Sequence, residues 1–166
     1  MGLELPDPPA SLPGAPRAFY DEFRKMLGLV DPKAVDRERS KVTFDDEGVE
    51  LHIAHAEHDD VAIWAGVSDD DAIVATGGVH EHFAPDVRAD EERPWTMEIV
   101  DFVAEILRGQ IEIDTTFRGR SPIAVSHFRV EDSGERVPFG RTGFLSASRL
   151  FFWAPKRVET ERVSFL

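Results

Sequence analysis

Apolar residues recur at helical spacing in two parts of the chain, and each part predicts a helix. The first follows Pro16, a residue that suits the opening turn of a helix, and its apolar positions are Phe19, Phe23, Met26, Leu27 and Val30. The second follows Pro94, and its apolar positions are Ile99, Phe102, Val103, Ile106 and Leu107. Gly109 then stands where a left-handed residue ends many helices. We therefore expect an N-terminal helix and one central helix.

Most of the remaining chain has strand patterns, in which apolar and polar residues alternate or β-branched residues gather between turn residues. The expected strands are 41–44, 49–55, 61–68, 72–83, 111–117, 123–130, 142–155 and 156–166. Most connections between them are short turns, which join antiparallel neighbours. The sequence thus predicts an α+β fold, in which a mostly antiparallel sheet of about six to eight strands packs against the N-terminal helix and the central helix.

The first 16 residues differ in composition from the rest of the chain. They contain five prolines and few large apolar side chains, so burial offers little to offset the entropy that ordering them costs. We expect a disordered Pro-rich tail at 1–16 and a single α+β domain at 17–166. The start of the chain lacks the basic and apolar parts of a secretory signal, and no run approaches the roughly 18 apolar residues of a membrane span. We expect a cytoplasmic bacterial protein that does not bind membranes.

Charge is distributed unevenly. The chain carries 32 acidic and 19 basic side chains, a net charge of −13 at neutral pH, and residues 41–92 hold 15 of the acids with only 2 bases. Phosphate contacts require clustered Lys and Arg, so we do not expect a nucleic-acid partner. The acidic stretch is either a solvated surface or a surface that attracts a basic protein partner. In the second interpretation the partner-binding residues are Asp59, Asp60, Asp69, Asp70 and Asp71.

Histidines provide the candidate chemistry, since the chain has no cysteine. If one strand runs from Ala72 to Phe83, the period of two places the His80 and His82 imidazoles on one face, about 7 Å apart, together with Val74 and Thr76. Such a pair is compatible with one divalent metal ion, and the third ligand would be His52, Glu50 or His127. The alternatives are that these imidazoles satisfy hydrogen bonds at a sheet edge or turn, or that they transfer protons or sense pH. We expect no other cofactor.

Familiar catalytic motifs are absent from the sequence. It contains no G-x-x-x-x-G-K-[ST], no G-x-G-x-x-G, no H-E-x-x-H and no G-x-S-x-G. We therefore favour a protein that is not an enzyme. The segment Leu150-Phe151-Phe152-Trp153 would present apolar side chains on both faces of a strand. Either a second layer or a subunit contact must cover them, and the second possibility indicates a homodimer.

The segment GVSDDDAIVATGGVHEHF, the helix EIVDFVAEILRG and the strand IEIDTTFRG together resemble a layout of small uncharacterised bacterial proteins. In that layout a strand ending in His-x-His-Phe precedes a helix and an antiparallel meander. Some proteins of this type resemble immunity proteins of polymorphic toxin systems, and this resemblance implies a stoichiometric inhibitor. Our first hypothesis is therefore an acidic, protein-binding, immunity-like module. The alternatives are a metal-dependent enzyme or metal-binding protein centred on His80 and His82, and a dimeric scaffold.

Overall fold

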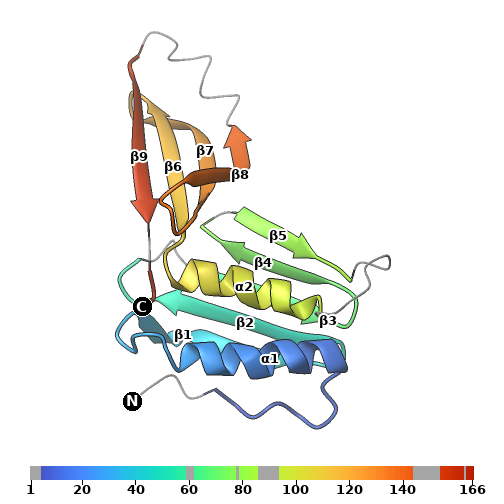
Figure 1. Cartoon of the computed structure of the whole chain (residues 1–166). Coiled ribbons are helices and arrows are strands. Elements are labelled where there is room, and N and C mark those ends of the chain that lie inside the picture. The colour runs from blue at the N-terminus through green and yellow to red at the C-terminus, as the bar shows by residue number, and fades with distance from the viewer. Residues whose placement is uncertain (1–4, 59–61, 78, 86–93, 144–153, 163) are drawn as a thin grey trace. The chain divides into compact units, whose positions relative to one another are not determined.

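A computed structural model describes residues 5–58, 62–77, 79–85, 94–143, 154–162 and 164–166 (Figure 1). In these residues the chain forms two helices and nine strands, and the strands make one antiparallel sheet of five and one of four. This confirms the α+β class with mostly antiparallel sheet. It differs from the prediction in having one more strand than expected and two sheets in place of one. Of the helices in the described part of the chain, none has the length and apolar content needed to cross a membrane.

The chain forms two compact units, where the sequence pattern predicts a single domain from 17 to 166. Unit 1 comprises residues 1–108 together with 164–166, and unit 2 comprises residues 109–163. Unit 2 is thus an insertion into unit 1 in terms of chain order. The apolar pattern does not reveal this division, because strand periodicity identifies strands without saying which sheet each one joins.

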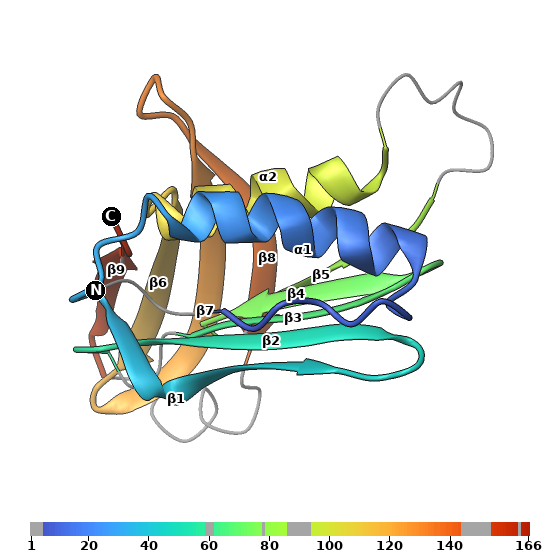
Figure 2. The same cartoon turned by 90° about the horizontal axis from the view of Figure 1, so that it is seen from below.

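Unit 1 is a five-stranded antiparallel sheet with both helices on one of its faces (Figure 2). Its elements, in chain order, are α1 (Gly14–Leu27), β1 (Val35–Phe44), β2 (Gly48–His55), β3 (Ala62–Ser68), β4 (Ala72–Thr76), β5 (Val79–Phe83) and α2 (Thr96–Leu107). The strands lie in the order β1-β2-β3-β4-β5, so each pairs with its neighbour in sequence. This local pairing follows from the short turns between the strands.

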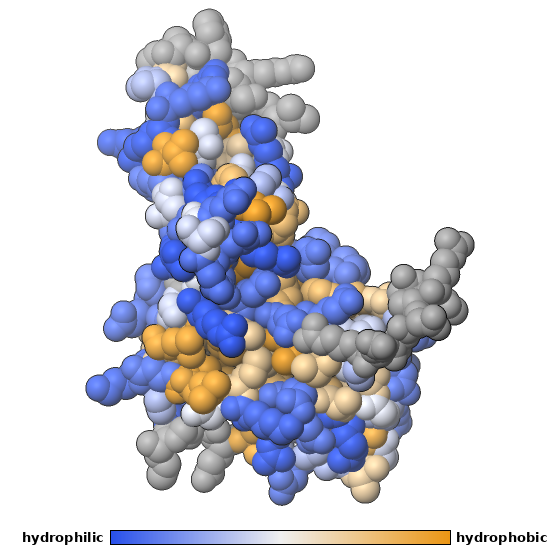
Figure 3. Space-filling model, in the orientation of Figure 1, coloured by the Kyte–Doolittle hydropathy of each residue, from blue (hydrophilic) through white to orange (hydrophobic). Residues whose placement is uncertain are grey.

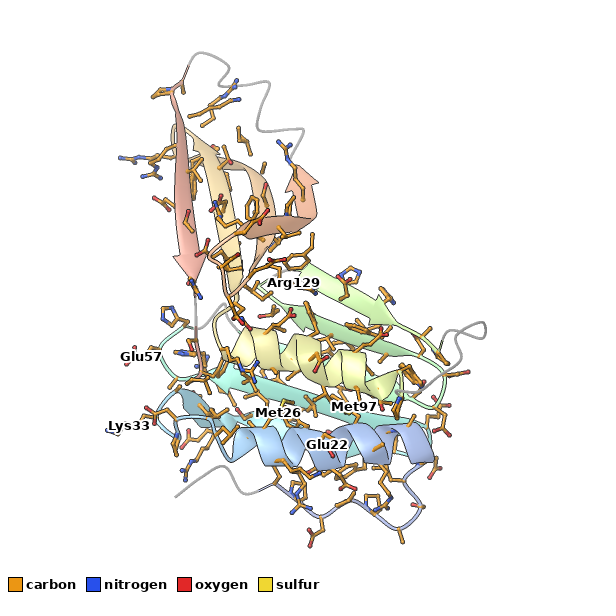
Figure 4. All side chains as sticks on the ribbon, in the orientation of Figure 1. Glu22, Met26, Lys33, Glu57, Met97 and Arg129 are labelled. Atoms are coloured by element: carbon orange, nitrogen blue, oxygen red, sulfur yellow. The ribbon has the colours of Figure 1, made fainter. Side chains whose placement is uncertain are left out.

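The core of unit 1 lies between the sheet and the two helices. Alternate residues of each strand point toward the helices, and helix positions three and four apart point back. The side chains that are completely buried there include Phe19, Tyr20, Phe23, Leu51, Ile53, Ile63, Ala65, Val74, Ile99 and Val103. Met26 of α1 and Met97 of α2 lie along the seam between the helices (Figure 4). The predicted helical stripes are the buried faces of α1 and α2.

Residues 5–13, expected to be part of a disordered tail, lie along α1. The Tyr20 hydroxyl donates a hydrogen bond to the carbonyl oxygen of Pro6 over 2.7 Å, and the Arg24 guanidinium pairs with Asp7 over 3.0 Å. Leu12 is 5% exposed, and the helix begins at Gly14. Polar side chains of α1 thus satisfy groups of the proline-rich segment. Burial raises the pKa of Tyr20 to about 12, so its hydroxyl remains a donor at neutral pH.

The long strand that the pattern predicts from Ala72 to Phe83 is divided at Gly77. Thr76 pairs with Val79, and Gly77 has a φ of 54°, in the left-handed region that glycine enters without strain. Two glycines between alternating residues are a hairpin signal, so the chain reverses and forms β4 and β5. The prediction that Val74 and Thr76 share a face with the two histidines is wrong, because both are core residues paired with Glu81 and Val79.

Unit 2 is a four-stranded antiparallel sheet in the order β8-β7-β6-β9. Its strands are β6 (Ile111–Arg118), β7 (Ser121–Val130), β8 (Arg136–Gly143) and β9 (Lys156–Arg162). The first two match the predicted hairpin, and β9 matches the start of the strand predicted for 156–166. Strand β8 begins before the strand predicted for 142–155. The aromatic segment from Leu150 to Trp153, on which the homodimer prediction depends, lies outside the described residues.

The last three residues complete the core of unit 1. Phe165 is completely buried, and its ring meets that of His55 edge to face at 4.9 Å. Its backbone N–H donates to Leu107, its carbonyl accepts from Asp31, and the Ser164 hydroxyl donates to the same Leu107 oxygen. His55 is itself buried, with Nε2 3.2 Å from the Ser164 carbonyl and Nδ1 accepting from the Glu57 N–H. The structure thus uses His55 to secure a returning segment.

An apolar patch is visible at this end of unit 1 (Figure 3). Two exposed leucines belong to this end of unit 1. Leu29 directly follows α1 and is 76% exposed. Leu166 is 57% exposed and directly follows Phe165, whose carbonyl accepts a hydrogen bond from Asp31. Glu57 and Lys33 lie on the same side of the unit (Figure 4).

The buried position of Phe165 leads to a stability prediction. Replacing Phe165 with Ala removes a completely buried ring and leaves a cavity against His55, so we expect the free energy of unfolding of unit 1 to fall by about 3 to 5 kcal/mol. Urea denaturation followed by circular dichroism, with hydrogen exchange of the β2 amides, measures this loss. Leu166→Ala is the matched control, and we expect a change within about 0.5 kcal/mol there. Equal effects of the two substitutions would contradict the role given to Phe165.

Candidate functional site on the open face of unit 1

The face of the five-stranded sheet that points away from α1 and α2 carries four of the five predicted metal ligands, namely Glu50, His52, His80 and His82. Paired residues of neighbouring antiparallel strands point to the same side of a sheet. The register therefore aligns one row of side chains across all five strands on this open face: Lys41, His52, Trp64, Ala75 and His80. The adjacent row on the same face is Thr43, Glu50, Gly66, Ile73 and His82.

Trp64 occupies the centre of the open face. Its indole Nε1 donates a hydrogen bond to Glu50 Oε1 over 3.0 Å. Its ring lies over Gly66, where an added Cβ would come within 3.2 Å of the indole carbons. Gly66 thus makes room for the ring, which separates the histidine on β2 from those on β5. Sequence alternation places Trp64 on this face, but only the register shows that it stands between them.

His80 and His82 form the closest pair of imidazoles in the predicted site. Both are exposed, both belong to β5, and their ring centroids are 5.1 Å apart in an edge-to-face arrangement. Among the described strands, β5 lies at the edge of the sheet, with β4 as its neighbour. The two rings can therefore present nitrogen atoms to a common ligand, as the alternation within 79–83 predicts.

His52 shares the open face but does not join this pair. It lies on β2, and β3 and β4 stand between it and β5, a separation of about 14 Å across three strand spacings. Its Nδ1 lies 2.9 Å from the Arg39 carbonyl. Glu50 is engaged by Trp64, and His127 is a buried residue of unit 2. Within the described ranges, the structure contains no group of three or more His, Asp or Glu side chains placed to hold a metal ion.

The two acidic turns lie side by side at one end of the sheet. Asp45, Asp46 and Glu47 connect β1 to β2, and Asp69, Asp70 and Asp71 connect β3 to β4. The register pairs Gly48 with Ser68 and so brings the turns together. Gly48 is required for this approach, because a Cβ there would lie 2.0 Å from the Val67 carbonyl oxygen. Asp59 and Asp60 lie outside the described residues.

Several of these acids have structural partners. Asp69 Oδ1 accepts a hydrogen bond from the Ala15 N–H over 3.0 Å, at the first turn of α1. That helix has no acidic residue in its own first turn, so a carboxylate from a distant turn complements its N-terminal dipole. Asp45 Oδ1 accepts from the Glu47 and Gly48 N–H groups, and Asp70 accepts from the Ser68 hydroxyl. The sequence around Ala15 and the sequence around Asp69 contain no signal that would have predicted this contact.

The two units differ in net charge. Unit 1 contains 25 acidic and 10 basic side chains, a net charge of −15, and unit 2 contains 7 and 9, a net charge of +2. The net negative charge of the chain thus belongs to unit 1. All six acids of the two turns are exposed.

Unit 2 carries a network of charged residues that the sequence does not single out. Arg136 Nε lies 2.8 Å from Glu112 Oε2, and its Nη2 lies 2.8 Å from Asp114 Oδ1. The same guanidinium stacks 4.0 Å from the centre of the Phe128 ring, and Thr160 donates to Asp114 over 2.6 Å. Burial works to raise the pKa of Asp114, but the Thr160 hydrogen bond and the Arg136 guanidinium outweigh it and hold this pKa below its usual value. This network ties β6 to β8 and β9.

Comparisons of the chain with family models, with curated proteins and with solved structures found no match in any of the three.

The contact between Asp69 and α1 generates a prediction. Asp69→Ala removes the hydrogen bond to the Ala15 N–H and the negative charge beside the helix N-terminus, so we expect the free energy of unfolding of unit 1 to fall by about 0.5 to 2 kcal/mol. Urea denaturation followed by circular dichroism measures the change. Asp71→Ala, in the same turn, is the control with an expected change within about 0.5 kcal/mol. An Asp69 variant as stable as the wild type would rule out the cap.

The Arg136 network predicts a pH-dependent effect in unit 2. Because the folded-state pKa of Asp114 is lowered, its carboxylate stabilises the fold above the unfolded-state pKa of about 3.9, and this contribution is lost as the pH falls through the folded value. Asp114→Asn should therefore destabilise unit 2 at pH 7, and the difference from wild type should shrink below about pH 4. Urea denaturation across this range measures it, with Asp132→Asn in the exposed β7–β8 turn as control. A difference that stays constant with pH would contradict this assignment.

Proposed function

We propose that unit 1 is a binding module for a basic protein partner and that the acidic end of its sheet forms the contact surface. The observation that carries the proposal is the juxtaposition of the β1–β2 and β3–β4 turns, which gathers six carboxylates at one end of the sheet. An inhibitor of the immunity type, as the resemblance of 61–118 implies, would use such a surface to cover a basic active site. Opposed potentials speed the encounter and select the partner.

All six carboxylates are exposed, but they differ in the hydrogen bonds that they accept from the fold. Asp69 and Asp45 bond backbone N–H groups of the fold, so replacing them would change stability as well as binding. Asp70 accepts from the Ser68 hydroxyl, whereas the carboxylates of Asp46, Glu47 and Asp71 accept no hydrogen bond within the described part of the chain. We therefore assign the partner contact chiefly to these three. Two of them are additions to the predicted set, in which Asp59 and Asp60 stay as predictions.

A second candidate function is metal binding centred on His80 and His82. It is favoured by the 5.1 Å separation of the two ring centroids on an exposed edge strand. Imidazole nitrogen is a preferred ligand of zinc, nickel and copper ions.

Neutralising the exposed acids tests the partner proposal. The variant Asp46→Asn, Glu47→Gln, Asp71→Asn removes three charges without removing either backbone cap. Immobilised wild-type chain should retain a basic protein from lysate of its native host at about 50 mM salt, and the variant should retain at least ten times less. With the captured protein purified, the association rate should fall steeply between about 50 and 500 mM salt, because screening shortens the reach of the attraction.

The control removes the same charge elsewhere. Glu131→Gln, Asp132→Asn, Glu135→Gln neutralises three exposed acids in the β7–β8 turn of unit 2 and should bind like the wild type. Retention of the same protein by the wild type, the control and the unit 1 variant alike would refute the acidic contact surface. Retention of no basic protein by the wild type would remove the proposal altogether.

A further inference from the structure

The structure assigns to β5 a half-site for a divalent metal ion, and we infer that a second copy of the chain completes it by pairing β5 with its own β5. The inferred site holds one zinc-like ion between four imidazoles, His80 and His82 from each copy. This inference rests on the proposal that His80 and His82 bind a metal ion, and it adds the source of the remaining ligands. It does not depend on the proposed basic partner.

The first step is the incompleteness of the pair. Two imidazoles lie 5.1 Å apart on an exposed strand, and within the described residues no third His, Asp or Glu joins them in a group that could hold a metal. His52 lies three strands away on the same face. Zinc in proteins takes four ligands in a stable structural site. A half-site of two ligands needs a partner that brings two more.

The second step is the position of β5. It is the last strand of the sheet order, and β4 is its paired neighbour. Because Thr76 and Val79 close a two-residue turn, alternate residues of β5 direct their backbone groups toward β4, and we expect the backbone groups of His80 and His82 to point to the outer edge. An antiparallel strand added there would bond at the two histidines.

The third step is the symmetry of the sequence. Val79-His80-Glu81-His82-Phe83 has the same order of residue classes in both directions. A two-fold axis through Glu81 therefore places His80 of each copy opposite His82 of the other, on the same open face. A shift that centres the axis on His80 or His82 leaves only one histidine opposite another. Cross-strand neighbours stand about 4.5 to 5.5 Å apart, which brings the four rings within reach of one ion.

Glu81 gives a reason why the inferred dimer would need the metal ion. It pairs with Val74, on the core side of the sheet, and is half-buried there. In the symmetric pair the two Glu81 carboxylates face each other across the axis, and like charges directly opposite are destabilising. An inward-pointing charge on an edge strand also discourages uncontrolled pairing. Without metal the chains should stay apart, and bound metal should supply the attraction that overcomes this repulsion.

Zinc titration of the full-length chain without a histidine tag tests the inference. Sedimentation velocity should show a monomer in EDTA and a dimer after zinc is added, and calorimetry should give one zinc per two chains. His80→Ala and His82→Ala should each abolish the zinc-dependent dimer. His52→Ala, on the same face three strands away, should retain it. Circular dichroism checks that the exposed variants fold.

Glu81 offers two further readouts. Glu81→Gln should lower the zinc concentration needed for half-maximal dimer by at least fivefold, because the central repulsion is gone. Glu81→Cys in this cysteine-free chain places two thiols opposite each other in the zinc-bound dimer. With oxidised glutathione added as the oxidant, which is reduced to two glutathione thiols, a disulfide dimer that forms faster with zinc than without it reports the register. Glu50→Cys, on β2, should form none at that rate.

Three results would overturn the inference. One zinc bound per monomer would show that the chain supplies its own further ligands, and the metal-binding candidate would stand without the second copy. A zinc-dependent dimer that survives the double substitution His80→Ala, His82→Ala would place the ion elsewhere. No zinc binding at micromolar concentration would end both this inference and the metal candidate.

Discussion

The burial of only one face of the five-stranded sheet governs the rest of unit 1. Helices α1 and α2 lie on one face, so most of the strand residues that point toward them are apolar, and the intervening residues are free to vary. A shift of one residue in any strand would exchange the two sets of side chains. The core side chains Leu51, Ile63 and Val74 thus fix the positions of His52, Trp64 and Ala75 beside them. The open face, with its histidines, takes its layout from the core.

Most helices and strands were predictable from sequence, because the spacing of apolar residues follows the face of each element that is buried. The stripes that follow Pro16 and Pro94 are the buried faces of α1 and α2, and Gly109 has the left-handed φ of 69° expected of a residue that ends a helix. The division into two sheets was not predictable. It depends on the pairing of β6 with β9, across a stretch of chain that no local pattern spans.

The site was predictable in part for the same reason. Alternation within five residues places His80 and His82 on one face, whereas the distance from His52 depends on how many strands intervene. The pair of glycines at 77–78 in the sequence is a local signal of a hairpin, and the prediction of one continuous strand through it assigned Val74 to the wrong face. The cap that Asp69 provides to Ala15 joins residues 54 positions apart, so neither helix propensity nor turn propensity could reveal it.

The return of the chain to unit 1 at Ser164 has a consequence for the order of folding. The Leu107 oxygen receives its bonds from Ser164 and Phe165, which follow it by more than 50 residues, and His55 contacts a carbonyl 109 positions away. Contacts so distant in sequence close late, after the loop between them has been made. During synthesis on the ribosome, strands β6 to β9 of unit 2 emerge before residues 164–166. They can therefore pair with one another before these residues complete the core of unit 1. We therefore expect unit 1 to reach its final packing only after residues 164–166 have been translated.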